Sequence, residues 1–189
     1  MTLYSLVLFV HVTAVLALCA ALSIEVLSLH QLRRASSFTE VRRWIQPVPD
    51  LPLVTAASAL VIFISGIYLT LRMSAFELAW PKVTIGALLL IAPFGAITGK
   101  RIRAIRQACG EAKAINSELM RRMQDPFLKV SLGIRTAVFL GIVLLMSAKP
   151  ELWDSIIIVG VSALLGLLSS LLVWRRARSL EVPSAGLGG

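Results

Sequence analysis

The chain of 189 residues is 57% hydrophobic and only 15% charged, and its mean hydropathy is +0.84. Because soluble domains are about 45 to 50% apolar and about a quarter charged, this composition excludes an ordinary water-soluble fold. The formal charge of +9 does not indicate a nucleic-acid partner, because the Lys and Arg residues flank the apolar runs, as they do in membrane proteins that retain basic residues in the cytoplasm.

Five apolar runs reach or approach the length needed to cross a bilayer. The first covers residues 3–29, which is enough for a hydrocarbon core of about 30 Å, and no Lys or Arg precedes it, which argues against a cleaved signal peptide. The others cover residues 51–71, 83–99, 130–148 and 155–174. We therefore expect an all-α, polytopic membrane helix bundle with five transmembrane helices in a single domain over residues 1–178.

The distribution of basic residues predicts the orientation of these spans. Of the 19 Lys and Arg residues, all but Arg72, Lys82 and Lys149 lie between the first two spans, in the stretch from Lys100 to Arg135 that leads from the third span into the start of the fourth, or in the tail. Segments rich in Lys and Arg stay in the cytoplasm. We expect a multi-pass protein of the cell inner membrane, with the N-terminus outside and the C-terminus cytoplasmic.

A cytoplasmic helical extension is predicted over residues 100–124, as a continuation of the third span. Its apolar residues recur at steps of three and four, which is helical spacing, and Asp125 followed by Pro126 is a start signal for the next helix. The basic face of this segment could hold anionic lipid or a partner protein; the alternative is a solvated charged face above an apolar stripe at the membrane interface. The tail over residues 179–189 is predicted to be flexible. The apolar residues of the extension are Ile102, Ile105, Cys109, Ala112, Leu119 and Met123.

Small residues four apart predict which helix faces pack together. Helices in lipid associate through close approach of their backbones, which Gly, Ala and Ser allow. We expect these faces to point inward, and Pro93 to kink the third span. The residues are Gly95 and Gly99 in the third span, Gly133, Ala137 and Gly141 in the fourth, and Ser162, Gly166 and Ser170 in the fifth.

His11 is the first of two ionisable side chains in the spans that need an explanation, because a charge within the bilayer costs free energy. One interpretation is a ligand for haem b or a metal, a proton-transfer group or a contact to a quinone. The other is a neutral ring that is hydrogen-bonded across helices, and Ser65, Tyr68 and Ser162 lie at a suitable depth. Met146 is near enough in depth to be a second haem ligand, although a methionine there can also serve only for packing.

Glu25 is the second ionisable group, and it lies near the inner end of the first span. Its side chain could pair with Arg135 of the fourth span, whose guanidinium can extend to the interface, or it could reach water at the cytoplasmic surface. Such a pair would fix the depth of two helices without taking part in chemistry.

The chain resembles small bacterial integral membrane proteins that are grouped as a domain of unknown function. The resemblance covers about residues 3–150 and is carried by His11, the stretch from Ser65 to Leu69, Trp80, and the run from Met146 to Pro150. More distantly, the chain is similar to the copper-resistance protein D and HemJ-type protoporphyrinogen oxidase families, which also have a histidine in an early helix. At His11, that likeness implies copper or haem.

These features predict an integral inner-membrane protein that is non-enzymatic or of unassigned molecular function, for example an accessory subunit of a membrane complex. Its candidate partners are the lipid bilayer, another membrane protein or a second copy of the chain in a homo-oligomer. No phosphate loop, nucleophile elbow or cysteine metal motif occurs in the sequence. The alternatives are a redox protein that binds haem or a metal through His11, and a small permease with a cavity beside Pro93 and His11.

Overall fold

The computed structural model describes residues 2–34, 37–45, 51–111 and 117–179, and every regular element within these ranges is a helix. Five of the helices are long and apolar enough to cross a membrane, which confirms the predicted helical class and the five predicted apolar helices. They are α1 (Leu3–Arg34), α3 (Leu51–Arg72), α4 (Ala79–Glu111), α6 (Pro126–Ala148) and α7 (Leu152–Ser179). The shorter elements are α2 (Phe38–Ile45), the 3-10 helix η1 (Ala75–Glu77) and α5 (Ser117–Met123).

The predicted extension of the third span is present as the far end of α4, which continues without a break to Glu111 and contains both Pro93 and Gly110. Residues 112–116, including Ala112, lie outside the described residues, and α5 begins at Ser117. The predicted flexible tail also lies outside them, apart from Ser179 at the end of α7.

Both ends of α6 follow from local sequence. Asp125 precedes the helix, its carboxylate accepts a hydrogen bond of 2.9 Å from the backbone N–H of Phe127, and Pro126 occupies the first turn, where its missing N–H costs nothing. At the other end Lys149 adopts a left-handed conformation with φ of 49°, and its backbone N–H donates to the carbonyl of Leu145. The short turn that follows leads directly into α7.

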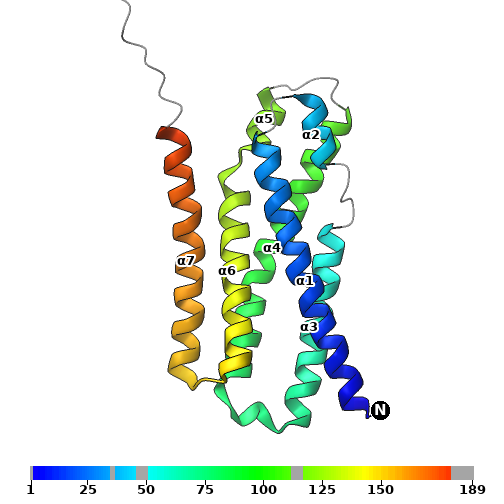
Figure 1. Cartoon of the computed structure of the whole chain (residues 1–189), viewed down its shortest axis with the longest axis vertical. Coiled ribbons are helices and arrows are strands. Elements are labelled where there is room, and N and C mark those ends of the chain that lie inside the picture. The colour runs from blue at the N-terminus through cyan, green and yellow to red at the C-terminus, as the bar shows by residue number, and fades with distance from the viewer. Residues whose placement is uncertain (1, 35–36, 46–50, 112–116, 180–189) are drawn as a thin grey trace, which may run out of the picture.

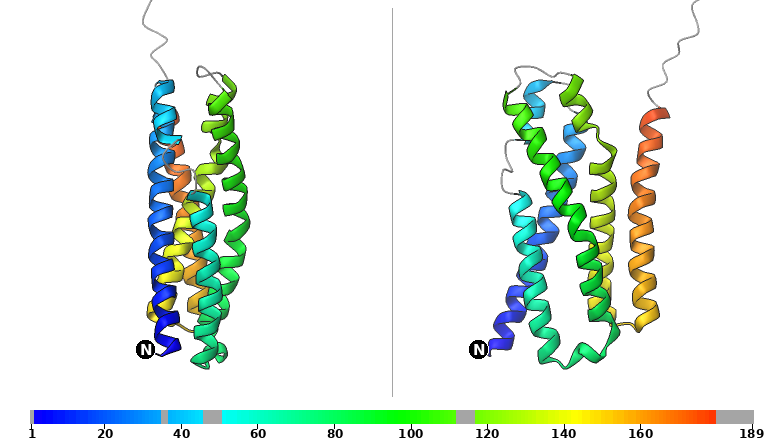
Figure 2. Two further views of the ribbon diagram at one scale, coloured as in Figure 1. Left: turned by 90° about the vertical axis from the view of Figure 1, so that its right-hand side faces the viewer. Right: turned by 180° about the vertical axis from the view of Figure 1, so that it is seen from behind.

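The long helices run side by side (Figure 1, Figure 2). The most extensive contacts join α1 to α3, α6 to α7, and α4 to α6, whereas α1 touches α6 and α3 touches α4 over small areas. The N-terminus, η1 and the α6–α7 connection lie at one end of the bundle, and α2 and α5 lie at the other (Figure 1). We call these the N-terminal end and the cap end.

The cap end contains a small apolar core of its own. Val41 of α2 is fully buried, and it packs with Ile105 and Cys109 of α4 and Met123 of α5. The stripe predicted to lie at the membrane interface is therefore covered over these residues. The prediction missed this because it did not anticipate α2, whose amphipathic pattern spans only two turns.

The bundle itself is joined by a second core that includes residues of α1, α3 and α6. Leu18 and Leu22 of α1 pack there against Ile62 of α3 and Phe139 of α6. This core lies between the two polar sites described below, because His11 precedes it on α1 and Glu25 follows it.

Candidate functional site

His11 lies on α1 against α3. Its Nδ1 atom is 2.8 Å from the hydroxyl oxygen of Ser65, and the residue is 7% exposed. Gly66, the next residue of α3, leaves space for the ring, because a Cβ added there would lie 3.4 Å from Cε1 of His11. The hydroxyl of Ser65 also donates a hydrogen bond to the carbonyl of Val61, one turn earlier in α3. Ser65 is thus the one of the three predicted partners that lies beside the histidine.

The other two predicted partners of His11 lie elsewhere, which corrects the prediction. The hydroxyl of Tyr68 accepts a hydrogen bond of 3.2 Å from Nε of Arg72, and Ser162 on α7 packs against Gly141 on α6. The prediction used depth along the helix axis, and depth does not determine which face of a helix a side chain occupies or which helices are neighbours.

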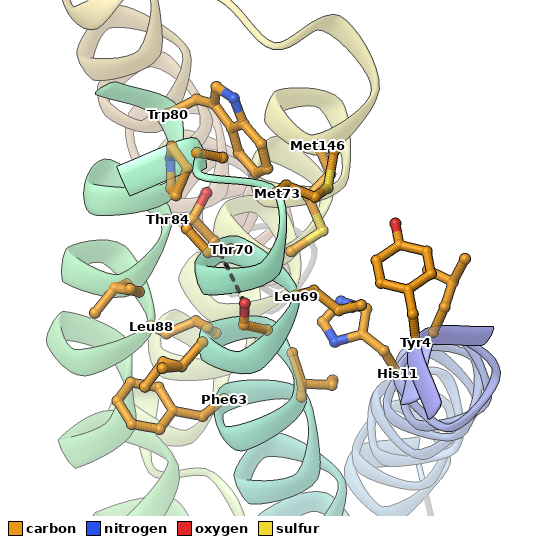
Figure 3. A pocket seen from close by; sticks show the side chains of 17 residues that line it. Tyr4, His11, Phe63, Leu69, Thr70, Met73, Trp80, Thr84, Leu88 and Met146 are labelled. Atoms are coloured by element: carbon orange, nitrogen blue, oxygen red, sulfur yellow. Dashed lines mark hydrogen bonds between the residues drawn. The ribbon is translucent and has the colours of Figure 1, made fainter. Parts of the chain in front are cut away.

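A cavity of about 270 Å³ lies beside His11 at the N-terminal end of the bundle (Figure 3). It is bounded by α1, α3, η1 and α4, with Met146 of α6 at one side, and it is partly open rather than enclosed. Its surface is almost entirely apolar. Side chains on its lining include Tyr4, Leu8, Phe63, Leu69, Met73 and Leu88.

Two residues on this lining bury a polar atom that has no hydrogen-bond partner in the described part of the chain. These atoms are Nε1 of Trp80 and Oγ1 of Thr84, both on α4. Thr55 and Thr136 bury such atoms away from the cavity. Buried polar groups are usually satisfied because an unpaired one costs about 1 to 3 kcal/mol. Two of the four buried, unpaired side-chain atoms in the described part of the chain therefore belong to residues that line this cavity.

Met146 lines the same cavity as His11, so the structure brings the two predicted haem ligands to one site. Neither residue is accompanied there by an acidic side chain or by a cysteine. Among the described residues, no group of three His, Cys, Asp or Glu side chains is placed to hold a metal ion.

Glu25 and Arg135 form a second polar site, farther along α1. Nη1 of Arg135 donates to Oε1 of Glu25 at 3.2 Å, and the two residues are 6% and 8% exposed, respectively. Gly95 of α4 lies beside this pair, because a Cβ added there would be 3.5 Å from Nε of Arg135. The predicted packing glycine thus leaves room for a guanidinium instead of a neighbouring backbone.

A third polar contact, which the sequence analysis missed, joins α4 to α6. The hydroxyls of Thr98 and Ser131 are 2.8 Å apart, and Ser131 donates to the carbonyl of Phe94 at 3.2 Å. Ser131 is fully buried and Thr98 nearly so. Both are uncharged, so nothing in their residue types singled them out among the many Ser and Thr residues of the spans.

The predicted small-residue faces of the fourth and fifth spans meet each other along α6 and α7. A Cβ at Gly166 would lie 2.8 Å from Cα of Ile134 and 2.9 Å from Cβ of Ala137, closer than side chains approach. A Cβ at Gly133 would collide with the side chain of Ser170 and with the carbonyl oxygen of Gly166. In the structure, these two faces therefore pack against each other.

The remaining small residues have different neighbours. A Cβ at Gly141 would collide with the side chain of Ser162, which extends the α6–α7 contact toward the N-terminal end. A Cβ at Gly99 would lie 3.6 Å from Cβ of Pro52, so this glycine of α4 faces α3, whereas Gly95 faces α6. The two glycines of the third span therefore contact two different helices.

Comparison of the chain with known proteins gave no match to a protein-family model, to a curated protein or to a solved structure. The candidate site is therefore defined by its own geometry: a buried histidine that is held by Ser65 at the edge of an apolar cavity.

Proposed function

We propose that this chain is a multi-pass protein of the bacterial inner membrane, with its N-terminus outside and the cap end in the cytoplasm. Large apolar side chains such as Phe9, Leu16 and Leu90 are 65% to 68% exposed on the long helices, which is favourable in lipid and costly in water. The concentration of Lys and Arg in the segments of the cap end supports the orientation.

We also propose that the protein binds a small lipid-soluble molecule in the cavity beside His11. The observation that carries this proposal is a buried imidazole on the lining of an otherwise apolar cavity. Ligand sites in proteins are mostly apolar, with a few polar groups that orient the ligand.

Haem b is the second candidate ligand, since His11 and Met146 both line the cavity. The volume of about 270 Å³ argues against it, because it lies just below the range of about 300 to 1,000 Å³ that is typical for drug-sized ligands. Haem is at least as large as such ligands, so the helices would have to separate to admit it. A purified protein with a Soret absorption band that is lost in His11→Ala would favour haem.

The permease and accessory-subunit interpretations stay predictions. The permease requires a cavity beside both Pro93 and His11, and the lining of this cavity includes His11 but not Pro93. An accessory subunit would bind its partner through a surface that faces lipid in the isolated chain.

Photolabelling tests the proposed binding function. The protein in lipid nanodiscs is irradiated with a long-chain alcohol that carries a diazirine, and the modified residues are identified by mass spectrometry. We expect the label on cavity residues such as Leu8, Phe63 and Leu69. Leu88→Trp, which fills the cavity, should reduce this labelling at least fivefold.

Leu90→Trp is the matched control, because Leu90 lies two residues farther along α4 and is 67% exposed. It introduces the same side chain on the outside of the bundle and should leave cavity labelling unchanged. Labelling spread evenly over outward-facing residues such as Leu89, with no response to Leu88→Trp, would contradict the proposed function.

A further inference from the structure

The hydrogen bonds around Ser65 determine which nitrogen of His11 carries the proton. The Ser65 hydroxyl oxygen lies within hydrogen-bond distance of the carbonyl oxygen of Val61 and of Nδ1 of His11. A carbonyl can only accept, and two oxygens in such close contact repel each other unless a proton lies between them. Ser65 therefore donates its one hydroxyl proton to Val61 and accepts a hydrogen bond from His11 Nδ1–H.

This arrangement makes the second ring nitrogen an acceptor. A neutral imidazole with its proton on Nδ1 has a lone pair on Nε2. Within the described part of the chain, the side-chain hydrogen bond of the ring is made by Nδ1, and the backbone carbonyl of Ile62, which also lies 3.3 Å from the Ser65 hydroxyl, is a second polar group near the ring. No hydrogen bond within that part of the chain is made by Nε2, so this nitrogen is available to a molecule in the cavity. No carboxylate lines the cavity, so a protonated ring would have no counter-ion there.

Because Nε2 can only accept a hydrogen bond, it favours a ligand that can donate one. A molecule with an O–H group can donate to Nε2, whereas a ketone, an ether or a quinone offers only acceptors and leaves two lone pairs facing each other. Sites that are built to hydrogen-bond a hydroxyl reject analogues that lack it, because the buried partner is then left unpaired. The remaining apolar lining favours a ligand that is otherwise hydrocarbon or aromatic.

We propose, building on the binding function proposed above, that the ligand is a lipid-soluble alcohol or phenol whose hydroxyl donates to Nε2 of His11. A hydroquinone belongs to this class and its oxidised quinone does not, so the cavity distinguishes the two by hydrogen-bond polarity alone. Ser65 is a positioning residue. It holds the ring proton on Nδ1, and it donates its own hydroxyl proton to Val61 and not to the ligand.

Competition between two matched probes tests this proposal. 4-Octylphenol and its methyl ether, 4-octylanisole, have the same ring and tail, but only the phenol can donate a hydrogen bond. Each is added in increasing amounts to the photolabelling reaction in nanodiscs. We expect the phenol to displace the label from the cavity at a concentration at least tenfold lower than the ether. The ether leaves the buried Nε2 without a hydrogen-bond donor, and the cost of one such unpaired group corresponds to about this ratio of affinities.

Variants at Ser65 test whether this residue determines the preference for the phenol over the ether. If Ser65 served only to stabilise the fold, its replacement would not change that preference. In Ser65→Ala the ring loses the acceptor that holds its proton on Nδ1, so Nε2 can carry the proton and donate to the ether. The preference for the phenol should then fall at least threefold, while Ser65→Thr, which retains the hydroxyl, should keep it. Thermal unfolding of each variant shows whether the fold is retained.

The outcomes separate this inference from the binding function on which it rests. Equal displacement by the phenol and the ether in the unmodified protein would overturn the inference and leave the binding function standing. Displacement by neither probe, together with labelling that ignores Leu88→Trp, would overturn both. A preference for the phenol that persists unchanged in Ser65→Ala would overturn the role of the tautomer.

Discussion

Glu25 and Arg135 are both more than nine-tenths buried, and the bond between them joins α1 to α6, which otherwise touch over a small area. Taking two charges out of water is expensive, and their attraction offsets this cost only while both are present. Gly95 contributes by leaving space for the guanidinium. The pair therefore restrains the position of α1. Replacing only one of the two residues should destabilise the protein more than replacing both.

We predict that Glu25→Leu destabilises the protein by about 3 to 5 kcal/mol, because it leaves the guanidinium buried without a counter-charge. Arg135→Leu should cost less, since a carboxyl group can take up a proton and become neutral, whereas a guanidinium stays charged. The double variant should be the most stable of the three. Thermal unfolding in a mild detergent measures the order, and a double variant that is as unstable as the sum of the two single variants would contradict it.

Residue-scale prediction from sequence worked best where charge restricts the choice. Arg135 is the one cation within the predicted spans, so the sequence offered a single ionic partner for Glu25, and the structure pairs the two residues. For His11 three hydroxyl-bearing residues at similar depth were equivalent in the sequence, and only the packing of α1 on α3 distinguishes Ser65. The contact between Thr98 and Ser131 carried no sequence signal.

At the scale of elements, α6 and α7 show what small residues permit. Their backbones approach so closely that a Cβ at Gly133 or Gly166 would overlap atoms of the other helix. In lipid such close packing replaces the hydrophobic effect as the main source of helix association. Since α7 has its largest contact with α6, this seam determines whether α7 stays docked.

We predict that Gly166→Ala destabilises the protein by about 1 to 3 kcal/mol, the usual cost of forcing an extra methyl group into a packed interface. Gly160→Ala, also on α7, is the matched control, because nothing lies within 4 Å of its added Cβ. That control should be neutral or slightly stabilising, since alanine favours a helix over glycine by about 1 kcal/mol. Equal unfolding midpoints for the two variants in detergent would show that the seam does not hold α7.

The prediction of elements succeeded for long helices and failed for a short one. Each apolar run of spanning length is a helix in the structure, which is the form expected of a run that lies in hydrocarbon, because a helix satisfies its own backbone groups. By contrast, α2 is only 8 residues long. Helices of that length are not stable by themselves, so its formation depends on docking Val41 against α4 and α5, which a sequence alone does not display.

At the scale of the whole molecule, two helix groups meet around the candidate site. One group is α1 with α3, and the other is α4, α6 and α7; the contacts between the groups are sparse compared with those within them. The cavity beside His11 lies at the N-terminal end and is lined by residues of α3, η1 and α4 as well as α1. A ligand there would contact both groups and strengthen their association, whereas the Glu25–Arg135 pair joins them on the other side of the apolar core.

The position of this cavity relative to the two sides of the membrane depends on the proposed orientation, which a pair of single-cysteine variants tests. Glu151 lies in the α6–α7 connection at the N-terminal end and Gln107 lies on α4 near the cap end, and both are exposed. In a background with Cys19→Ala and Cys109→Ala, we predict that a membrane-impermeant maleimide applied to intact spheroplasts labels Glu151→Cys and spares Gln107→Cys. Both should react once the membrane is permeabilised, because the reagent then reaches the cytoplasmic side. The reverse pattern in intact spheroplasts would place the basic cap outside and the His11 cavity near the cytoplasm, against the expected retention of Lys and Arg on the inner side.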